Sequence, residues 1–344
     1  MATRRHVLAG LMASALPRLS WADAGSPTFV AAAKDATGAF ALHGLSAEGA
    51  PLFAIPLPAR GHAAAAHPLR PEVVAFARRP GAYALVIGCA SGTVLARLTP
   101  PEGRQFNGHG AFSQDGSRLY TSEVVAETSE GRIGLWDTRS YLRIGEFASG
   151  GIGPHELRRL PGSELLVVAD GNLDAMRPNL SYLAPEGELL EQVELEAEYA
   201  QNSIRHLALA EDGTVAFAMQ WEGDPADPVP LLGLHRRGSP ARLCPPAETE
   251  AYAMKGYAGS IAIDAAVERL ALTSPRGSVV QLFAGDGTPL ATHPRQDACG
   301  VAAAAGGGFI VTDGGGAVSH LTDAGMRPLQ TTAAAWDNHL VRIA

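Results

Sequence analysis

Residues 108–116 read Gly108-His109-Gly110-Ala111-Phe112-Ser113-Gln114-Asp115-Gly116, an apolar segment that ends in a tight Asp-Gly turn. Three more short apolar segments follow at residues 118–123, 132–137 and 141–147, separated by turn or loop residues. Alternation over so few residues is typical of half-buried strands. Four such strands joined in series predict one blade of a β-propeller.

The same succession of strands and turns recurs along the chain. A repeat of about 45 residues is the period expected for propeller blades. The units of this kind begin near His62, Gly108, His155, His206, Ser260 and Gly300.

The two ends of the chain supply the remaining blade. Residues 28–57 contain only three predicted strands, whereas residues 336–343 form one strand of the kind that opens a blade. Pairing the two segments leaves no exposed edge strand where the ring closes. We therefore predict an all-β protein, a seven-bladed β-propeller with four-stranded blades, as a single domain over residues 25–344.

One position of the repeat carries a histidine in five of the seven blades. The first strand of each blade lines the central channel of a propeller, and its start lies at one mouth. The side chains at this position are therefore predicted to converge on the channel axis. Alignment on the turn that ends the first strand gives His109, His155 and His206, and the equivalent positions elsewhere are His339, His62 (with a longer turn), Ser260 and Gly300.

Carboxylates are expected at the same mouth. The loops that leave the second strands reach this face, and two of them begin with Glu123 and Asp170. Neutral imidazole and carboxylate together are ligands for iron, zinc, copper or manganese. The five histidines with Glu123 and Asp170 are therefore the candidate metal ligands, and the carboxylates could instead fix the histidine tautomers.

A structural role for the histidines is the alternative. In WD40 propellers a Gly-His dipeptide beside each blade forms structural hydrogen bonds, and this chain contains Gly61-His62 and Gly108-His109 as well as Trp136-Asp137 and Trp336-Asp337. In WD40 repeats that histidine lies well before the first strand. Here it lies inside the strand or at its edge.

Two arginines are expected on the same face as the histidines. Arg205 directly precedes His206, and Arg276 follows the second strand of the next unit. Together they could hold an anionic substrate. The plainer interpretation is that both are ordinary surface arginines.

The first 24 residues are predicted to be a twin-arginine signal peptide. Arg4 and Arg5 precede an apolar stretch at residues 7–16, and Ala22-Asp23-Ala24 has the small-x-small pattern of a cleavage site. The apolar stretch is too short to span a membrane. We predict export in the folded state to the periplasm and no stable membrane insertion after cleavage.

Charge and cysteine content exclude several classes of function. A formal net charge of −8 argues against nucleic acid and anionic lipid as partners. The chain has three cysteines and no C-x-x-C-H motif, which excludes covalently attached c-type haem. No G-x-S-x-G, H-E-x-x-H or Walker pattern is present, so no reaction is predicted from a motif.

Several of these segments resemble a family of Tat-exported proteins of unknown function, found beside imelysin-type iron-regulated proteins and dihaem-peroxidase-like oxidoreductases in Gram-negative bacteria. The resemblance implies a periplasmic role in iron acquisition, with iron as the metal and imelysin-like or dihaem proteins as partners. It implies no reaction. Its most specific part is Gly150-Gly151-Ile152-Gly153-Pro154-His155-Glu156-Leu157, and the others include residues 108–116, 131–137, 172–180 and 203–207.

Three functions are compatible with these observations. The leading hypothesis is a periplasmic metal-binding propeller, for iron, that hands metal or electrons to a partner. The second is a protein-interaction platform in which the histidines are structural. The third is a metal-dependent oxidoreductase or hydrolase. Propellers host all three, so the fold alone does not decide between them.

Overall fold

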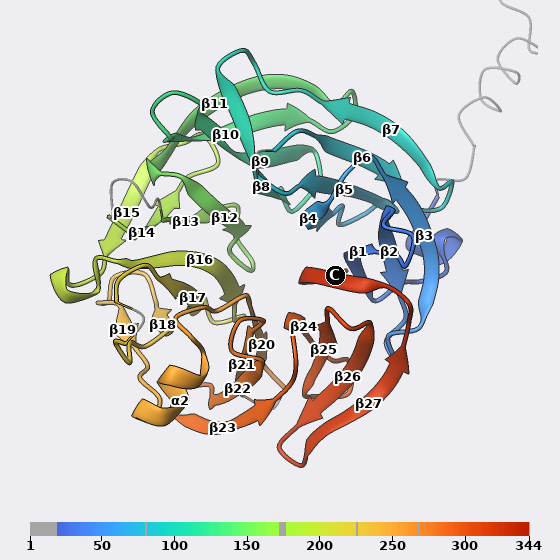
Figure 1. Ribbon diagram of the computed structural model, residues 1–344. Helices are drawn as coiled ribbons and strands as arrows, with labels where there is room; N and C mark the ends of the chain where they lie inside the picture. The colour runs from blue at the N-terminus through green and yellow to red at the C-terminus, as the bar shows by residue number, and fades with distance from the viewer. Residues whose placement is uncertain (1–18, 80, 172–176, 225, 267, 344) are drawn as a thin grey trace, which may run out of the picture.

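The computed structural model describes residues 19–79, 81–171, 177–224, 226–266 and 268–343 (Figure 1). Most of the predicted signal peptide, including Arg4, Arg5 and the apolar stretch, lies outside these residues. The described part of it contains the short 3-10 helix η1 (Trp21–Ala24). In the described part of the chain, no helix is long and apolar enough to cross a membrane.

Seven four-stranded antiparallel sheets surround a central axis, which confirms the predicted seven-bladed β-propeller (Figure 1). We number the blades in chain order from the one that contains both ends. Blade 1 consists of β28 (Ala335–Arg342), β1 (Phe29–Lys34), β2 (Phe40–Leu45) and β3 (Pro51–Leu57); blade 2 of β4 (Gly61–Ala66), β5 (Glu72–Ala77), β6 (Ala84–Gly88) and β7 (Thr93–Leu98); blade 3 of β8 (Arg104–Phe112), β9 (Arg118–Val125), β10 (Glu130–Asp137) and β11 (Leu142–Ile152).

The remaining blades follow the same order from the axis outward. Blade 4 consists of β12 (Pro154–Arg159), β13 (Leu166–Asp170), β14 (Asn179–Leu183) and β15 (Leu189–Glu194); blade 5 of β16 (Asn202–Leu209), β17 (Val215–Trp221), β18 (Leu232–His235) and β19 (Arg242–Leu243); blade 6 of β20 (Ser260–Asp264), β21 (Arg269–Ser274), β22 (Val279–Ala284) and β23 (Pro289–Pro294); blade 7 of β24 (Ala298–Ala303), β25 (Phe309–Asp313), β26 (Ala317–Thr322) and β27 (Gly325–Thr331).

The C-terminal strand closes the ring as predicted. β28 pairs antiparallel with β1, with Phe29 opposite Arg342 and Val30 opposite Val341. The first strand of blade 1 therefore comes from the end of the chain, and its other three strands come from the beginning. This pairing satisfies the backbone groups of both terminal strands, which would otherwise form two open edges.

Burial follows the position of a strand within its blade. The second strands β13 and β25 are buried at every residue, because each sheet packs between the two neighbouring blades. The outermost strand β11 alternates exposed and half-buried residues over its first seven positions. Burial of one Leu or Val side chain contributes about 1.5–3 kcal/mol, so the packing between blades provides much of the stability.

The helix between blades 5 and 6 was not predicted from the sequence. After the two-residue strand β19, the connection to blade 6 contains helix α2 (Glu248–Ala253), fastened to blade 6 by a hydrogen bond from Gln281 Nε2 to the carbonyl oxygen of Glu250. Six residues are too few to show a helical hydrophobic period, which explains why the pattern did not reveal it.

Candidate metal centre

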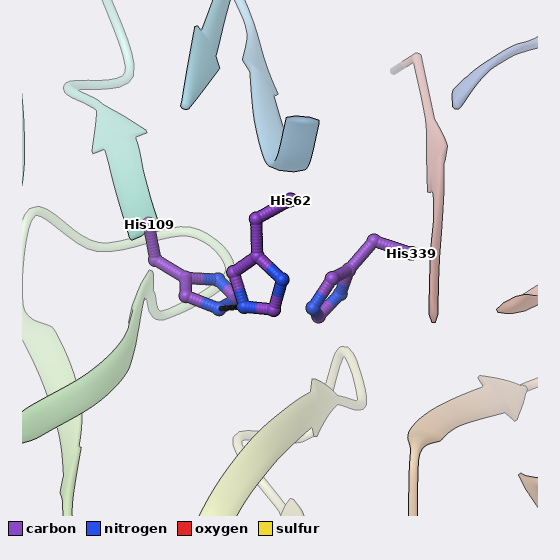
Figure 2. A group of neighbouring side chains, drawn as sticks. All are labelled: His62, His109 and His339. Atoms are coloured by element: carbon purple, nitrogen blue, oxygen red, sulfur yellow. Dashed lines mark hydrogen bonds between the residues drawn. The ribbon is translucent and has the colours of Figure 1, made fainter. Parts of the chain in front are cut away.

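Five histidines from five consecutive blades meet on the channel axis. Figure 2 shows three of them, His62, His109 and His339, pointing toward one another from β4, β8 and β28. We call the five side chains the histidine ring, because each imidazole contacts the next and the fifth contacts the first. The centroid distances are 4.6 Å for His339–His62, 4.9 Å for His62–His109, 4.9 Å for His109–His155, 4.8 Å for His155–His206 and 4.8 Å for His206–His339.

Irregular pairing of the first strands directs the histidines to the axis. A β-bulge leaves residues outside the regular ladder and re-aims their side chains. In β4, β8, β12 and β28 the histidine lies within the shifted segment, and in β16 His206 borders it. In β20 the pairing has no shift, and Ser260 stands at that position.

A glycine permits the close packing of two ring members. Gly108 has a φ of +98°, a backbone conformation that residues with a Cβ atom rarely adopt. A Cβ atom at this position would lie 2.7 Å from Cδ2 of His62. The absence of a side chain at Gly108 therefore lets the imidazole of His62 pack against that of His109.

Two cavities are lined by residues that neighbour the ring histidines in sequence. One, of about 620 Å³, is lined in part by Gly61 and Asn338, which directly precede His62 and His339. The other, of about 610 Å³, is lined in part by residues that follow ring histidines, including Ala64, Gly110 and Leu340. Four of the histidines are only 3–6% exposed, and His62 is half-buried.

The ring nitrogens are spaced as metal ligands require. Two groups of three, His62–His109–His339 and His109–His155–His206, have ligand atoms within 4.8 Å of one another, and His109 belongs to both. The Nε2 atoms of His62 and His109 lie 3.2 Å apart (Figure 2). Ligands at about 2.1 Å from a shared metal ion are themselves about 3–4 Å apart, so only small side-chain shifts are needed.

Several ring nitrogens are buried and lack a hydrogen-bond partner. A buried polar atom without a partner costs about 1–3 kcal/mol, which a metal–nitrogen bond would remove. This observation fits a ligand role better than a structural one, in which each nitrogen would bond to a neighbour. The atoms are Nδ1 of His62, Nδ1 of His155 and Nε2 of His339.

Four of the five ring histidines have pKa values below the usual one. Burial lowers the pKa of His62, His109 and His155 well below the usual value, and the positive charges of neighbouring histidines lower it further. Burial and the charge of His206 lower the pKa of His339 to about 3. The lowered pKa values favour neutral imidazole at these four positions, and neutral imidazole is the form that binds metal.

A glutamate missed in the sequence adjoins the ring. Glu156 is buried, and its Oε2 accepts a hydrogen bond from the backbone N–H of Leu207 and lies 3.5 Å from Nδ1 of His206. Burial raises its pKa, but Arg158, whose Nε is 2.6 Å from Oε1, and His206 outweigh this effect and bring the pKa to about 2. An ionised carboxylate in this place can orient His206. The sequence signal that could have suggested Glu156 as part of the site is its position directly after His155.

The two predicted carboxylates lie apart from both groups of three histidines. Glu123 is fully buried in β9, and its carboxylate accepts hydrogen bonds of 2.7 and 2.9 Å from Arg143 of the same blade. Asp170, at the end of β13, accepts a 2.7 Å hydrogen bond from Ser149 of the preceding blade. The carboxylate of Glu123 is engaged within its own blade, and that of Asp170 by the preceding blade. The two side chains therefore do not join the histidines, although the sequence had predicted that they would.

Asp170→Asn is expected to stabilise the protein at pH 8. Burial raises the pKa of Asp170 to about 7. A raised folded-state pKa means that stability is fully present below the unfolded value of about 4 and is lost as the pH rises through 7. The variant should therefore be more stable than wild type at pH 8, by on the order of 4 kcal/mol, and so unfold at a higher temperature; at pH 4 the two should unfold at nearly the same temperature.

Thermal melts at the two pH values measure this effect. The control is Asp212→Asn, which changes a half-exposed carboxylate paired with Arg236. A variant at Asp170 that melts below wild type at pH 8 would contradict the expectation.

The fold and the histidine ring together define the class of protein: a β-propeller in which imidazoles from five blades meet at the centre. Residues 55–343 match the family model described as "Protein of unknown function (DUF1513)", and the chain belongs to that family. No curated protein matches the chain in sequence. The family match carries no statement about export or iron, which stay predictions.

A solved structure supports the architecture. The chain is similar to hydrazine synthase of Kuenenia stuttgartiensis, with a TM-score of 0.63 over 86% of this chain and 90% of that chain. Sequence identity is 12%, so the similarity shows the propeller fold alone.

Proposed function

We propose that this protein is a metal-binding β-propeller whose histidine ring holds a divalent transition-metal ion on the channel axis. The observation that carries the proposal is the convergence of five imidazoles from five blades, in two groups with ligand atoms within 4.8 Å. The unpartnered ring nitrogens and the lowered pKa values support it. Imidazole suits iron, zinc, copper and nickel.

Iron is the metal that the family resemblance favours, and iron acquisition in the periplasm is the setting that we propose. Neutral imidazoles leave the charge of a bound ion uncompensated, and the ionised Glu156 beside His206 would offset part of it. In this role the protein passes metal or electrons to an imelysin-like or dihaem partner.

Metal titration tests the proposal. The mature protein is purified without a nickel column, analysed for metal content, and titrated anaerobically with Fe(II) and separately with Zn²⁺ and Cu²⁺. Wild type should bind about one ion per chain or more, and the triple variant His109→Ala/His155→Ala/His206→Ala should bind none at the ring. His293→Ala, in the outer strand β23, is the matched control and should bind as wild type.

Circular dichroism establishes that the triple variant is folded. Should alanine prevent folding, asparagine at the same three positions keeps polar groups of similar volume without the ligand nitrogens. Absence of metal binding by wild type for all three ions, or metal content unchanged in the folded triple variant, would contradict the proposal. The histidines would then be structural, as in the interaction-platform hypothesis.

A further inference from the structure

The last residues of the predicted signal peptide are folded in the structure. Ser20 caps the short helix η1, because its backbone N–H and its hydroxyl group donate hydrogen bonds of 2.7 and 2.9 Å to Oδ2 of Asp23. At the other end of η1, Gly25 has a φ of +84°, and its N–H donates a 3.0 Å hydrogen bond to the carbonyl oxygen of Ala22. Hydrogen bonds therefore stabilise both ends of a helix of only four residues.

Helix η1 is fastened to blade 2, although the chain runs from it into blade 1. The indole Nε1 of Trp21 donates a 3.3 Å hydrogen bond to the carbonyl oxygen of His67, in the turn between β4 and β5 and 46 residues away in sequence. Ala24 is 9% exposed and belongs to a core cluster that contains Val30 of blade 1 and Val73 of blade 2. Trp21 packs against the same cluster, so the helix contacts both blades.

The connection from η1 to β1 is tied to the propeller as well. The N–H of Ser26 donates a 2.9 Å hydrogen bond back to the carbonyl oxygen of Trp21. The N–H of Thr28 donates to the carbonyl oxygen of Leu45 at 2.8 Å, and the carbonyl oxygen of Thr28 accepts a 2.9 Å hydrogen bond from Ile343. The backbone before β1 is therefore held by η1 on one side and by both neighbouring strands of blade 1 on the other.

The predicted cleavage pattern Ala22-Asp23-Ala24 lies inside this folded segment. Proteases cut segments that are exposed and poorly ordered, whereas here the side chain of Ala24 is buried and the N–H of Gly25 is engaged. Because the protein is predicted to be exported in the folded state, η1 is already formed when the peptidase meets the chain. A second small-x-small pattern, Ala13-Ser14-Ala15, occurs upstream in the sequence.

We propose that the exported protein keeps residues 20–24 as a latch between blades 1 and 2, and that the signal peptide is cleaved upstream of the latch, after Ala15. The latch adds contacts beside β1, the strand that pairs with the C-terminal strand β28, and so reinforces the blade made from the two chain ends. The proposal rests on the predicted export. It goes beyond the proposed metal function and stands whether or not the histidine ring holds an ion.

Intact-mass measurement of the exported protein tests the cleavage position. The full chain is expressed with its own signal and without a tag in a Gram-negative host, and the protein is recovered from the periplasm. The expected first residue is Leu16, which leaves the latch in place. A chain that begins at Gly25 would overturn the proposal, and one that still begins at Met1 would overturn cleavage after Ala15.

Two matched substitutions identify the pattern that the peptidase reads. Ala22 is exposed, so Ala22→Gln spoils the small-x-small pattern before Gly25 without filling the core. We expect Ala22→Gln to be processed as wild type is, and Ala15→Gln to accumulate as the uncleaved precursor. Accumulation of the Ala22→Gln precursor, or processing of Ala15→Gln to a chain that begins at Gly25, would overturn the proposal.

Thermal melts of the exported protein test the latch itself. Trp21→Ala removes both the packing and the hydrogen bond to His67, and should lower the melting temperature by about 2–4 °C. Trp21→Phe keeps an aromatic ring without the donor and should melt between the two. Leu19→Ala, which changes a side chain that is 56% exposed and lies just outside the latch, is the control and should melt as wild type. Equal melting temperatures for Trp21→Ala and wild type would overturn the role of the latch.

Discussion

His109→Ala is expected to remove metal binding far more completely than any other single change in the histidine ring. His109 is the residue shared by both groups of three ligands, so its loss leaves neither group complete. His155→Ala leaves the group of His62, His109 and His339 intact. Loss of a residue that merely orients a ligand costs 10- to 100-fold in affinity, so we expect His109→Ala to cost at least about 100-fold.

Competition with a chromophoric chelator for Zn²⁺ measures these affinities. His155→Ala and His339→Ala should each retain a three-histidine group and lose about tenfold. His293→Ala, outside the channel, should bind as wild type. Equal losses for His109→Ala and His155→Ala would contradict the shared position of His109, and wild-type affinity in His109→Ala would place the metal elsewhere.

Arg143→Met is expected to destabilise the fold by about 3–5 kcal/mol without changing metal binding. Glu123 is fully buried, and Arg143 supplies both of its charged hydrogen bonds. Removal of the arginine leaves a buried carboxylate with only the hydroxyl group of Thr121 as a donor. Metal affinity is expected to stay unchanged because Glu123 belongs to neither group of three ligands, although the sequence suggested it as a ligand.

Chemical unfolding measures the stability of this variant. Arg132→Met, in the same blade, removes a partner of the half-exposed Glu130 and should cost less than about 1 kcal/mol. The double variant Glu123→Gln/Arg143→Met should recover much of the loss, because it no longer buries an unpaired charge. Similar stabilities for Arg143→Met and Arg132→Met would contradict the structural role of the pair.

The sequence was sufficient to predict the blades and the pairing of the two chain ends that closes the propeller, because both depend on local patterns. Strands of alternating residues and their turns repeat at blade length, and the unequal ends of the chain can only pair with each other. The common position of the five histidines was equally readable, since the first strand of every blade lines the same channel. Helix α2 was missed because six residues carry no usable period.

The carboxylates could not be placed from spacing alone. Position in a repeat locates a residue along its strand, but the partners of Glu123 and Asp170 depend on side chains from other strands, Arg143 and Ser149. Glu156 was missed for a related reason. Simple alternation puts it on the opposite face from His155, whereas the bulge between Pro154 and Glu156 breaks the alternation and lets both approach the ring.

Anomalous X-ray scattering from crystals of the protein grown with Co²⁺ tests the central claim most directly. The account predicts a single strong peak on the channel axis, about 2.1 Å from nitrogens of at least three histidines of the ring, one of them His109. A peak confined to other residues, or a ring that remains without a peak at saturating Co²⁺, would contradict a metal centre formed by these five histidines.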